Sequence, residues 1–184
     1  MIDLTKYLKV NNAAHILYFF EDENSYLNNM IAYIKAGLER NHHLLLIENN
    51  SLLNDVQKRI NKLLTIEDQK YIHYIDNHYF YCCYGDFHIH SIIEHFSEIL
   101  TPFINKKINI RTWAHVEWKE QDDIKSKIEE FENVADYRVN DIGLMSVCAY
   151  GASDVSASLQ TTMMRSHEYL MTDKEFVRSS LYRN

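Results

Sequence analysis

Glycine, proline and cysteine are all scarce in this sequence. Its 184 residues include four glycines, one proline and three cysteines. So little glycine and proline argues against disordered linkers, collagen-like repeats and a turn-rich all-β sandwich. The cysteines, Cys82, Cys83 and Cys148, show no metal-ligand spacing, so we predict no disulfide framework and a reducing, cytoplasmic environment.

Phosphate-binding loops and short catalytic motifs are missing as well. The glycines, Gly37, Gly85, Gly143 and Gly151, match neither a P-loop nor the GxGxxG motif that binds dinucleotides. Neither GxSxG nor HExxH occurs. The first strand-to-helix turn, in HILYFFEDENS (15–25), carries three acids that would repel a phosphate. We therefore exclude ordinary nucleotide hydrolysis and predict no cofactor and no catalytic set.

The sequence also lacks an excess of positive charge and a long apolar run. Its net charge is -7, with acids and bases interspersed, so it has no electrostatic footprint for nucleic acid or an anionic membrane. The first residues, MIDLTKYLKV, lack the basic start and apolar core of a signal peptide, and no apolar run is long enough to span a bilayer. We expect a soluble protein that binds neither nucleic acid nor membrane.

Length and composition predict one domain. A chain of 184 residues with 46% hydrophobic residues can bury one core and is rather short for two. We assign residues 1–184 to this domain, with 1–12 as an N-terminal extension and 174–184 as a C-terminal tail. The tail is too short for a DNA-binding module, so we expect no output domain in the chain.

Short apolar runs alternate with longer stretches of helical period along the chain. This alternation is typical of βαβ units and predicts a three-layer α/β fold, in which helices flank a mostly parallel sheet of five or slightly more strands. The predicted strands span residues 14–20, 43–48, 71–76, 108–118 and 144–150. The predicted helices begin at Asn24 or Ser25, Ser51, Asp86, Gln121, and Ser153 or Asp154.

The densest polar cluster in an apolar setting is RTWAHVEW (111–118). Strand alternation places Arg111, Trp113, His115 and Glu117 on one face. A carboxylate buried at a strand end needs a partner. Two interpretations of Glu117 are equally favoured. It forms an ion pair with Arg111 or another side chain, or it binds a ligand.

Four residues near this edge have alternative interpretations. Glu132 is more typical of a solvated helix edge than of a residue turned toward the sheet. Cys148 resembles a small buried apolar residue. Tyr150 either packs with its hydroxyl in water or presents that hydroxyl to a ligand, with packing slightly favoured. His167, taken by itself, is most typical of a partly buried histidine at the surface.

The third predicted helix and its approach are rich in histidine. His88 and His95 lie two turns apart, which is too wide for both to bind one metal ion without another segment, so we predict no metal site. We expect the Cys82–Cys83 pair either to pack within the protein or to face a partner, and not to bind a metal. The tyrosine-rich segment 71–85 is a candidate surface for a partner protein or a second copy, or else packs on the sheet edge.

The order of these motifs resembles the MEDS family, the methanogen/methylotroph DcmR-type sensory domain. The resemblance extends over residues 15–173 and rests on the stretches 15–49, RTWAHVEW, the FE pair on the following helix, and VCAYGASDVSASLQTTMMRSH. The family residues that recur in order are His15, Glu117, Glu132, Cys148, Tyr150 and His167. Gly151 departs from the family, which often has an acid or amide there.

This resemblance implies a relative of the RecA/KaiC-type fold that lacks the P-loop. Members occur beside DNA-binding or histidine kinase modules and are thought to sense small molecules, with hydrocarbon derivatives proposed for the founding member. The resemblance therefore implies a cytosolic sensory or regulatory domain without established catalysis. In this chain, the signal would pass to a partner protein such as a kinase or transcription regulator.

Together, the residues and the resemblance predict a sensory module that binds a small, partly apolar ligand at the carboxyl edge of the sheet. The predicted ligand-binding residues are His15, Trp113, Glu117, Trp118, Glu132, Tyr150 and His167. One alternative is a protein-interaction regulator, for example an inhibitor of a kinase or transcription factor, without a small ligand. The least favoured alternative is an enzyme that uses Glu117 as acid or base.

Overall fold

A computed structural model describes residues 4–182 of the chain. Residues 1–3 of the predicted N-terminal extension and residues 183–184 of the predicted tail lie outside the described part. The described residues form a seven-stranded sheet in the order β3-β2-β4-β5-β1-β6-β7. The strands are β1 (Ala14–Phe20), β2 (His43–Glu48), β3 (Ile72–Asp76), β4 (Ile110–His115), β5 (Met145–Gly151), β6 (Tyr169–Met171) and β7 (Phe176–Arg178).

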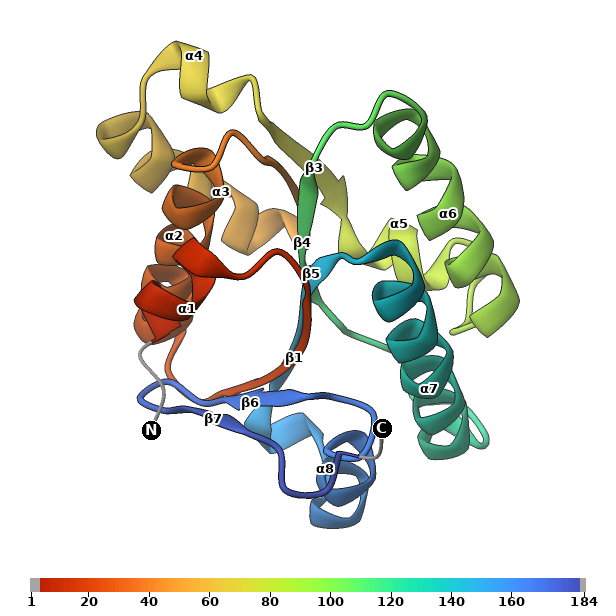
Figure 1. Cartoon of the computed structure of the whole chain (residues 1–184). Helices are drawn as coiled ribbons and strands as arrows, with labels where there is room; N and C mark the ends of the chain where they lie inside the picture. Colours follow the sequence, from red (N-terminus) through yellow and green to blue (C-terminus); the bar gives the residue numbers. More distant parts are fainter. Residues whose placement is uncertain (1–3, 183–184) are drawn as a thin grey trace.

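All pairs of neighbouring strands are parallel except β6 and β7, which are antiparallel. Helices cover both faces of the sheet (Figure 1). The helices are α1 (Leu4–Val10), α2 (Glu23–Leu38), α3 (Asn50–Leu63), α4 (Ile66–Gln69), α5 (Asn77–Cys82), α6 (Ile89–Asn105), α7 (Ile124–Ile142), α8 (Ala157–Met163) and the 3₁₀ turn η1 (Ala152–Asp154). The three-layer, mostly parallel α/β fold predicted from the sequence is confirmed.

The central strands are apolar on both sides because both faces are covered. Along β1, Ile16 and Tyr18 belong to the core beneath α1, α2 and α3, whereas Leu17 belongs to the core beneath α5, α6, α7 and α8. The run Leu44–Ile47 of β2 divides between the two cores in the same way. Such continuous apolar runs are typical of buried parallel strands.

The helices begin at caps that differ from the predicted ones. Asp22 caps α2, since its Oδ1 accepts a hydrogen bond from the backbone N–H of Ser25 at 2.8 Å. Asn49 caps α3, His88 caps α6 and Ser156 caps α8. A cap bonds to an N–H three residues further along, so a nearby polar residue can replace the predicted one without changing the helix.

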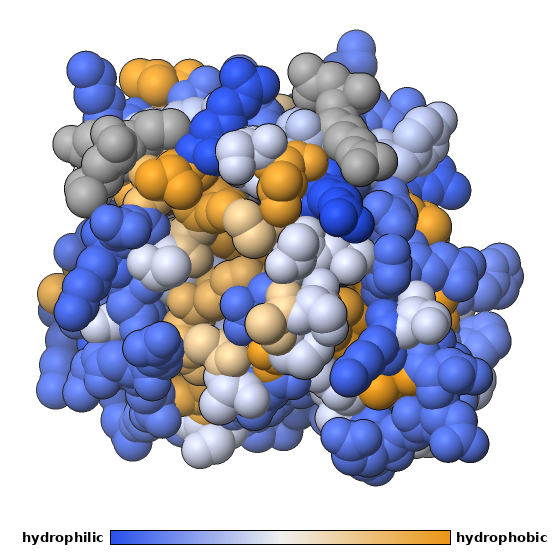
Figure 2. Space-filling view, turned by 90° about the horizontal axis from the view of Figure 1, so that it is seen from below, coloured by the Kyte–Doolittle hydropathy of each residue, from blue (hydrophilic) through white to orange (hydrophobic). Residues whose placement is uncertain are grey.

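The C-terminal part of the sheet differs from the prediction. Residues 174–184 were predicted to be a tail, but Phe176–Arg178 form β7, the last strand of the sheet. Phe176 is buried, and its ring lies 5.1 Å from that of Tyr7 near the start of the chain. Seen from below, on the side where β6, β7 and α8 lie in Figure 1, the molecule shows a band of apolar side chains between polar regions (Figure 2).

None of the described helices combines the length and the apolar character needed to cross a membrane.

Candidate functional site

A buried hydrogen-bond network lies at the carboxyl ends of β2 and β4. Glu48 ends β2 and His115 ends β4, and His115 Nδ1 lies 2.6 Å from Glu48 Oε1. The Tyr26 hydroxyl donates to Glu48 Oε2, and Trp113 Nε1 donates to the Tyr26 oxygen at 2.9 Å. The network therefore connects β2 and β4 with α2, the helix that carries Tyr26.

The electrostatics of this network favour an ion pair. Burial disfavours the charged form of His115, but the hydrogen bond to Glu48 and the charge of that carboxylate outweigh it and raise the pKa of His115 above its ordinary value. Burial and the Glu48 charge also raise the pKa of Tyr26 well above its ordinary value. Tyr26 therefore remains a neutral donor to Glu48.

Beside this network, Glu117 and Trp118 border an open hollow of about 490 Å³, which we call the edge hollow. Its lining consists of Val116, Glu117, Trp118, Glu120, Ser153 and Asp154. The Glu117 side chain is 49% exposed, and its Oε2 accepts hydrogen bonds from Asn77 at 2.6 Å and Asn49 at 3.3 Å. Arg111, proposed above as a partner of Glu117, instead donates to His42 Nδ1 at 2.9 Å, near the amino end of β4.

Four potential metal ligands form a second cluster, which we call the buried centre: His15, Glu132, Cys148 and His167. Four segments contribute one residue each: β1, α7, β5 and the loop between α8 and β6. Their ligand atoms all lie within 4.8 Å of one another, and every side chain is buried. Cys148 Sγ lies 3.4 Å from His15 Nε2, and Glu132 Oε2 lies 3.3 Å from His167 Nε2.

Hydrogen bonds from outside orient the buried centre. His15 Nδ1 lies 3.0 Å from the Ser166 carbonyl oxygen and 3.1 Å from Asp136 Oδ1. His167 Nδ1 lies 2.8 Å from the carbonyl oxygen of Met163. Because a carbonyl oxygen can only accept, both Nδ1 atoms carry a proton, and in the neutral form of each ring Nε2 presents a lone pair to the centre. The Tyr150 hydroxyl donates to Glu132 Oε1.

Burial and mutual charges perturb the groups of this centre. Burial and the nearby His167 lower the pKa of His15. Burial opposes ionisation of Glu132, but the charges that His167 and His15 carry when protonated, together with the Tyr150 hydroxyl, outweigh it and lower the pKa of Glu132. Burial and the charge of Glu132 raise the pKa of the Cys148 thiol well above its ordinary value. In this arrangement Glu132 is an anion and Cys148 is a neutral thiol.

The predicted site residues thus separate into three places. His15, Glu132, Tyr150 and His167 lie together in or beside the buried centre, so the surface positions favoured for Glu132 and His167 are wrong. Glu117 and Trp118 line the edge hollow. Trp113 reaches neither, because it is fully buried in the core beneath α2.

Sequence reasoning missed the roles of Glu48, Asn77 and Asp136, and it did not anticipate a metal-ligand set. Glu48 carried a signal, since it is an acid that directly ends a buried strand. Asp136 is one helical turn after Glu132, but only the position of β1 shows that it reaches His15.

The first strand-to-helix turn does not fit a phosphate. The carboxylate of Asp173, from the turn between β6 and β7, accepts hydrogen bonds from the backbone N–H groups of Glu21 and Asp22 at 3.0 and 2.9 Å. It also accepts one from the Tyr18 hydroxyl at 2.6 Å. The N–H groups that would hold an anion at this turn are thus already paired within the chain.

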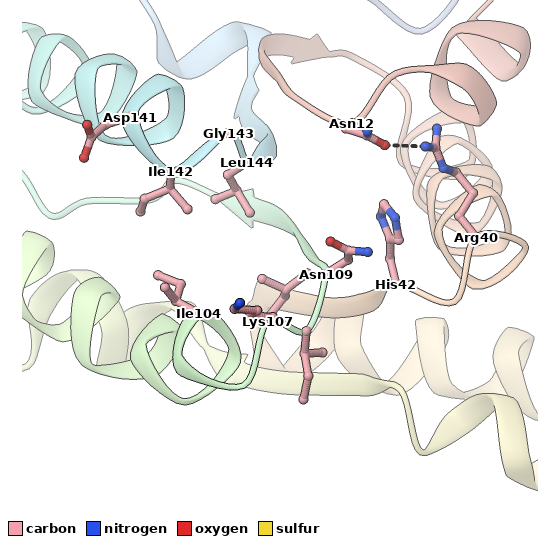
Figure 3. Close-up of a pocket in the computed structure, with 12 residues that line it drawn as sticks. Asn12, Arg40, His42, Ile104, Lys107, Asn109, Asp141, Ile142, Gly143 and Leu144 are labelled. Carbon is pink, nitrogen blue, oxygen red and sulfur yellow. Dashed lines mark hydrogen bonds between the residues drawn. The ribbon is translucent and has the colours of Figure 1, made fainter.

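A larger cavity, of about 990 Å³, opens at the opposite, amino edge of the sheet (Figure 3). Its polar side carries Arg40, hydrogen-bonded to Asn12, together with His42, and Ile104, Ile142 and Leu144 form the apolar side. Burial and the charges of Arg111 and Arg40 lower the pKa of His42 to about 4. The rule that ligands bind at the carboxyl ends of the strands gave no reason to expect a cavity here.

Comparisons with known proteins agree with this architecture. A family model described as MEDS, the methanogen/methylotroph DcmR sensory domain, matches residues 14–168. The crystal structure of the flagellar accessory protein FlaH from Methanocaldococcus jannaschii is similar, with a TM-score of 0.54 and 11% identity over 93% of this chain and 76% of FlaH. FlaH is RecA-like, and at this identity the likeness shows the fold alone. No curated protein sequence matches the chain.

Proposed function

Because the chain belongs to the MEDS family of sensory domains, we propose that it is a non-catalytic cytoplasmic module that binds a small molecule at the edge hollow and signals through a partner protein. Family membership supports a sensory or regulatory role. The RecA-like fold with its first turn closed by Asp173 supports regulation without nucleotide hydrolysis.

The contact between Trp118 and Tyr150 is the observation that carries this proposal. Trp118 lines the edge hollow, and its ring lies 6.0 Å from the ring of Tyr150. The Tyr150 hydroxyl in turn donates to Glu132 in the buried centre. A molecule that displaces Trp118 would therefore alter the packing of Tyr150 and its buried hydrogen bond to Glu132. Binding in the edge hollow can in this way change the structure of the buried centre.

The lining of the edge hollow indicates the kind of ligand. Glu117, Glu120 and Asp154 supply three carboxylates, which repel anions and attract cations. Trp118 and Val116 supply an aromatic ring and an apolar wall. A carboxylate beside a tryptophan suits a small organic cation with an apolar part.

The partner surface remains the segment 71–85. In this segment the side chains of Tyr79 and Tyr84 are exposed, whereas Phe80 and Tyr81 are buried. Exposed tyrosines favour contact with a protein partner, such as a kinase, a transcription regulator or a second copy of the chain.

The ligand proposal is tested by ligand-observed NMR with three probes of similar shape: tetramethylammonium, tert-butanol and pivalate. We expect tetramethylammonium to bind and pivalate not to bind. Glu117→Gln, which removes one charge of the hollow, should weaken tetramethylammonium binding roughly fivefold, as expected for about 1 kcal/mol near a surface.

Glu67→Gln is the matched control, because Glu67 is an exposed carboxylate on α4, away from the edge hollow. It should leave binding unchanged. Equal binding of pivalate, or equal losses in both variants, would contradict the proposed ligand class. Failure of all three probes would favour the alternative of a protein-interaction regulator without a small ligand.

A further inference from the structure

We propose that the buried centre binds one zinc ion through His15 Nε2, Glu132 Oε2, Cys148 Sγ and His167 Nε2. This proposal does not depend on the edge hollow or its ligand. It departs from the sequence-based expectation of no metal site, which considered only ligands close together along the chain. The four segments that supply these residues are far apart in the sequence.

The spacing of the ligand atoms fits a four-coordinate ion. With bond lengths of about 2.0–2.3 Å, neighbouring ligand atoms of a tetrahedral zinc site lie roughly 3.3–3.7 Å apart. The distances are 3.4 Å from Cys148 Sγ to His15 Nε2 and 3.3 Å from Glu132 Oε2 to His167 Nε2. His15 Nε2 lies 3.8 Å from Glu132 Oε2. The other pairs of ligand atoms lie within 4.8 Å of one another, so the side chains would have to close in by up to about 1 Å to surround an ion.

Both histidines are held in the tautomer that zinc requires. Histidines that bind metals usually donate their other ring N–H to a carbonyl or carboxylate. His15 does so to Ser166 and Asp136, and His167 does so to Met163. Tyr150 supports the carboxylate ligand in the same way, through Glu132 Oε1.

Two atoms of the centre need a positive partner. Glu132 Oε2 and His167 Nε2 are fully buried and have no hydrogen-bond partner among the described residues. When His167 is neutral, with its one ring proton on Nδ1, these two atoms face each other as lone pairs across 3.3 Å. A buried acceptor without a donor is costly, and a cation between the two would satisfy both.

The type and number of ligands favour zinc. Two imidazoles, one thiolate and one carboxylate suit zinc, whereas calcium and magnesium prefer oxygen ligands. On binding the ion, Cys148 would lose its thiol proton to solvent, and the resulting thiolate together with the carboxylate would balance the two charges of the ion, which matters in a fully buried site. Because the protein would fill all four positions, the ion would hold four segments together and would not bind substrate.

Cys148, His15 and Asp136 also follow the order of a nucleophile, a base and an orienting acid. The space beside them does not fit that role, because the adjoining cavity holds only about 30 Å³, about the volume of one water molecule. The Cys148 thiol is buried and its pKa is raised. Metal binding is therefore the better interpretation.

The test begins with the full chain, stripped of metal by a chelator and titrated with Zn²⁺ and with Co²⁺ as a spectroscopic probe. We expect one ion per chain. Bound Co²⁺ should show the strong visible bands of four-coordinate cobalt and a thiolate charge-transfer band. Cys148→Ser should abolish the charge-transfer band and weaken zinc binding at least about 100-fold, more than typical losses of outer hydrogen bonds to metal ligands.

Cys82→Ser is the matched control, because Cys82 is also a buried free thiol but is not part of the buried centre. It should leave both the band and the affinity unchanged. If Cys148→Ser fails to fold, X-ray absorption of the zinc-loaded wild-type chain replaces it, and should show one sulfur at about 2.3 Å and nitrogen or oxygen at about 2.0–2.1 Å.

Three results would overturn the proposal. The first is no binding of Zn²⁺ by the stripped chain, which would leave a buried His167–Glu132 ion pair as the explanation. The second is zinc binding that Cys148→Ser and Cys82→Ser affect equally. The third is an X-ray absorption spectrum of the zinc-loaded chain that shows no sulfur ligand.

Discussion

His42 shows how a single buried side chain can set a response to pH. Its Nδ1 accepts a hydrogen bond from Arg111 Nε, so it must stay neutral in the folded protein. Burial first, and then the charges of Arg111 and Arg40, lower its pKa to about 4. The ordinary value in an unfolded chain is about 6.5, so the unfolded state takes up the proton first as the pH falls.

The free energy of unfolding should therefore decline as the pH falls from about 6.5 to about 4, by about 3 kcal/mol from this residue, since a pKa difference of one corresponds to about 1.4 kcal/mol. The contribution is fully present above the unfolded pKa and is lost toward the folded one. Urea unfolding across this range measures it, and His42→Gln, which keeps a neutral acceptor, should make the decline smaller by this amount.

His90→Gln is the control, because the His90 side chain is 85% exposed, and it should keep the wild-type decline. Three other histidines whose pKa values are lowered add to the decline in the wild type and in both variants: His15, His43 and His73. His115 does not, since its pKa is raised and its stabilising effect is lost only as the pH rises above about 6.5. A decline of equal size in wild type and His42→Gln would contradict the assignment to His42.

At the same scale, the sequence predicts some residues of the site and not others. It identified His15, Glu132, Tyr150 and His167 through their order in a family, and the structure brings them together. It could not predict that Glu132 is buried, because Glu132 lies at the flank of an apolar stripe and its partners come from β5 and from beyond α8. Long-range contacts of this kind leave no local pattern.

At the scale of elements, Tyr26 connects α2 with the ends of two strands. Its hydroxyl accepts from Trp113 of β4 and donates to Glu48 of β2. Tyr26→Phe keeps the packing but leaves a buried indole N–H and a carboxylate oxygen without this partner. At about 1–3 kcal/mol for each unsatisfied buried group, the free energy of unfolding should fall by about 2–6 kcal/mol in urea unfolding.

Tyr137→Phe is the matched control, since Tyr137 lies on α7 with its side chain exposed. Exposed substitutions usually change stability by about 0.5 kcal/mol or less. Similar urea midpoints for Tyr26→Phe and the wild type would show that the network at the strand ends does not stabilise the fold.

Some secondary-structure elements can be predicted from the sequence and others cannot. The strands β1, β2 and β5 have continuous or nearly continuous apolar runs, whereas polar residues interrupt β3 and β4, and all five occur near the predicted positions. The strands β6 and β7 have three residues each, too few for a period to be recognised. The capping residues differ from the predicted ones because several polar residues in each turn are suitable hydrogen-bond acceptors.

At the scale of the whole molecule, Tyr150 joins the two proposed sites. Its ring packs on Trp118 of the edge hollow, and its hydroxyl fixes Glu132 of the buried centre. The order of the strands, which no local pattern specifies, places β5, with Cys148 and Tyr150, beside β1, with His15. Zinc on Glu132 Oε2 would hold Oε1 in place for Tyr150 and so keep the wall of the hollow in its binding position.

If both proposals hold, zinc should therefore strengthen the binding of tetramethylammonium. When Tyr150 and Trp118 are already held in place, ligand binding loses less conformational entropy. Couplings of 1–3 kcal/mol are typical, so we expect an affinity ratio of roughly 5 or more between the zinc-loaded and the stripped chain, measured by titration calorimetry. Tyr150→Phe should bring this ratio close to one, whereas Tyr74→Phe, on β3, should preserve it. By reciprocity, saturating tetramethylammonium should raise the zinc affinity by the same factor, and a ratio that survives in Tyr150→Phe would mean that the coupling takes another route.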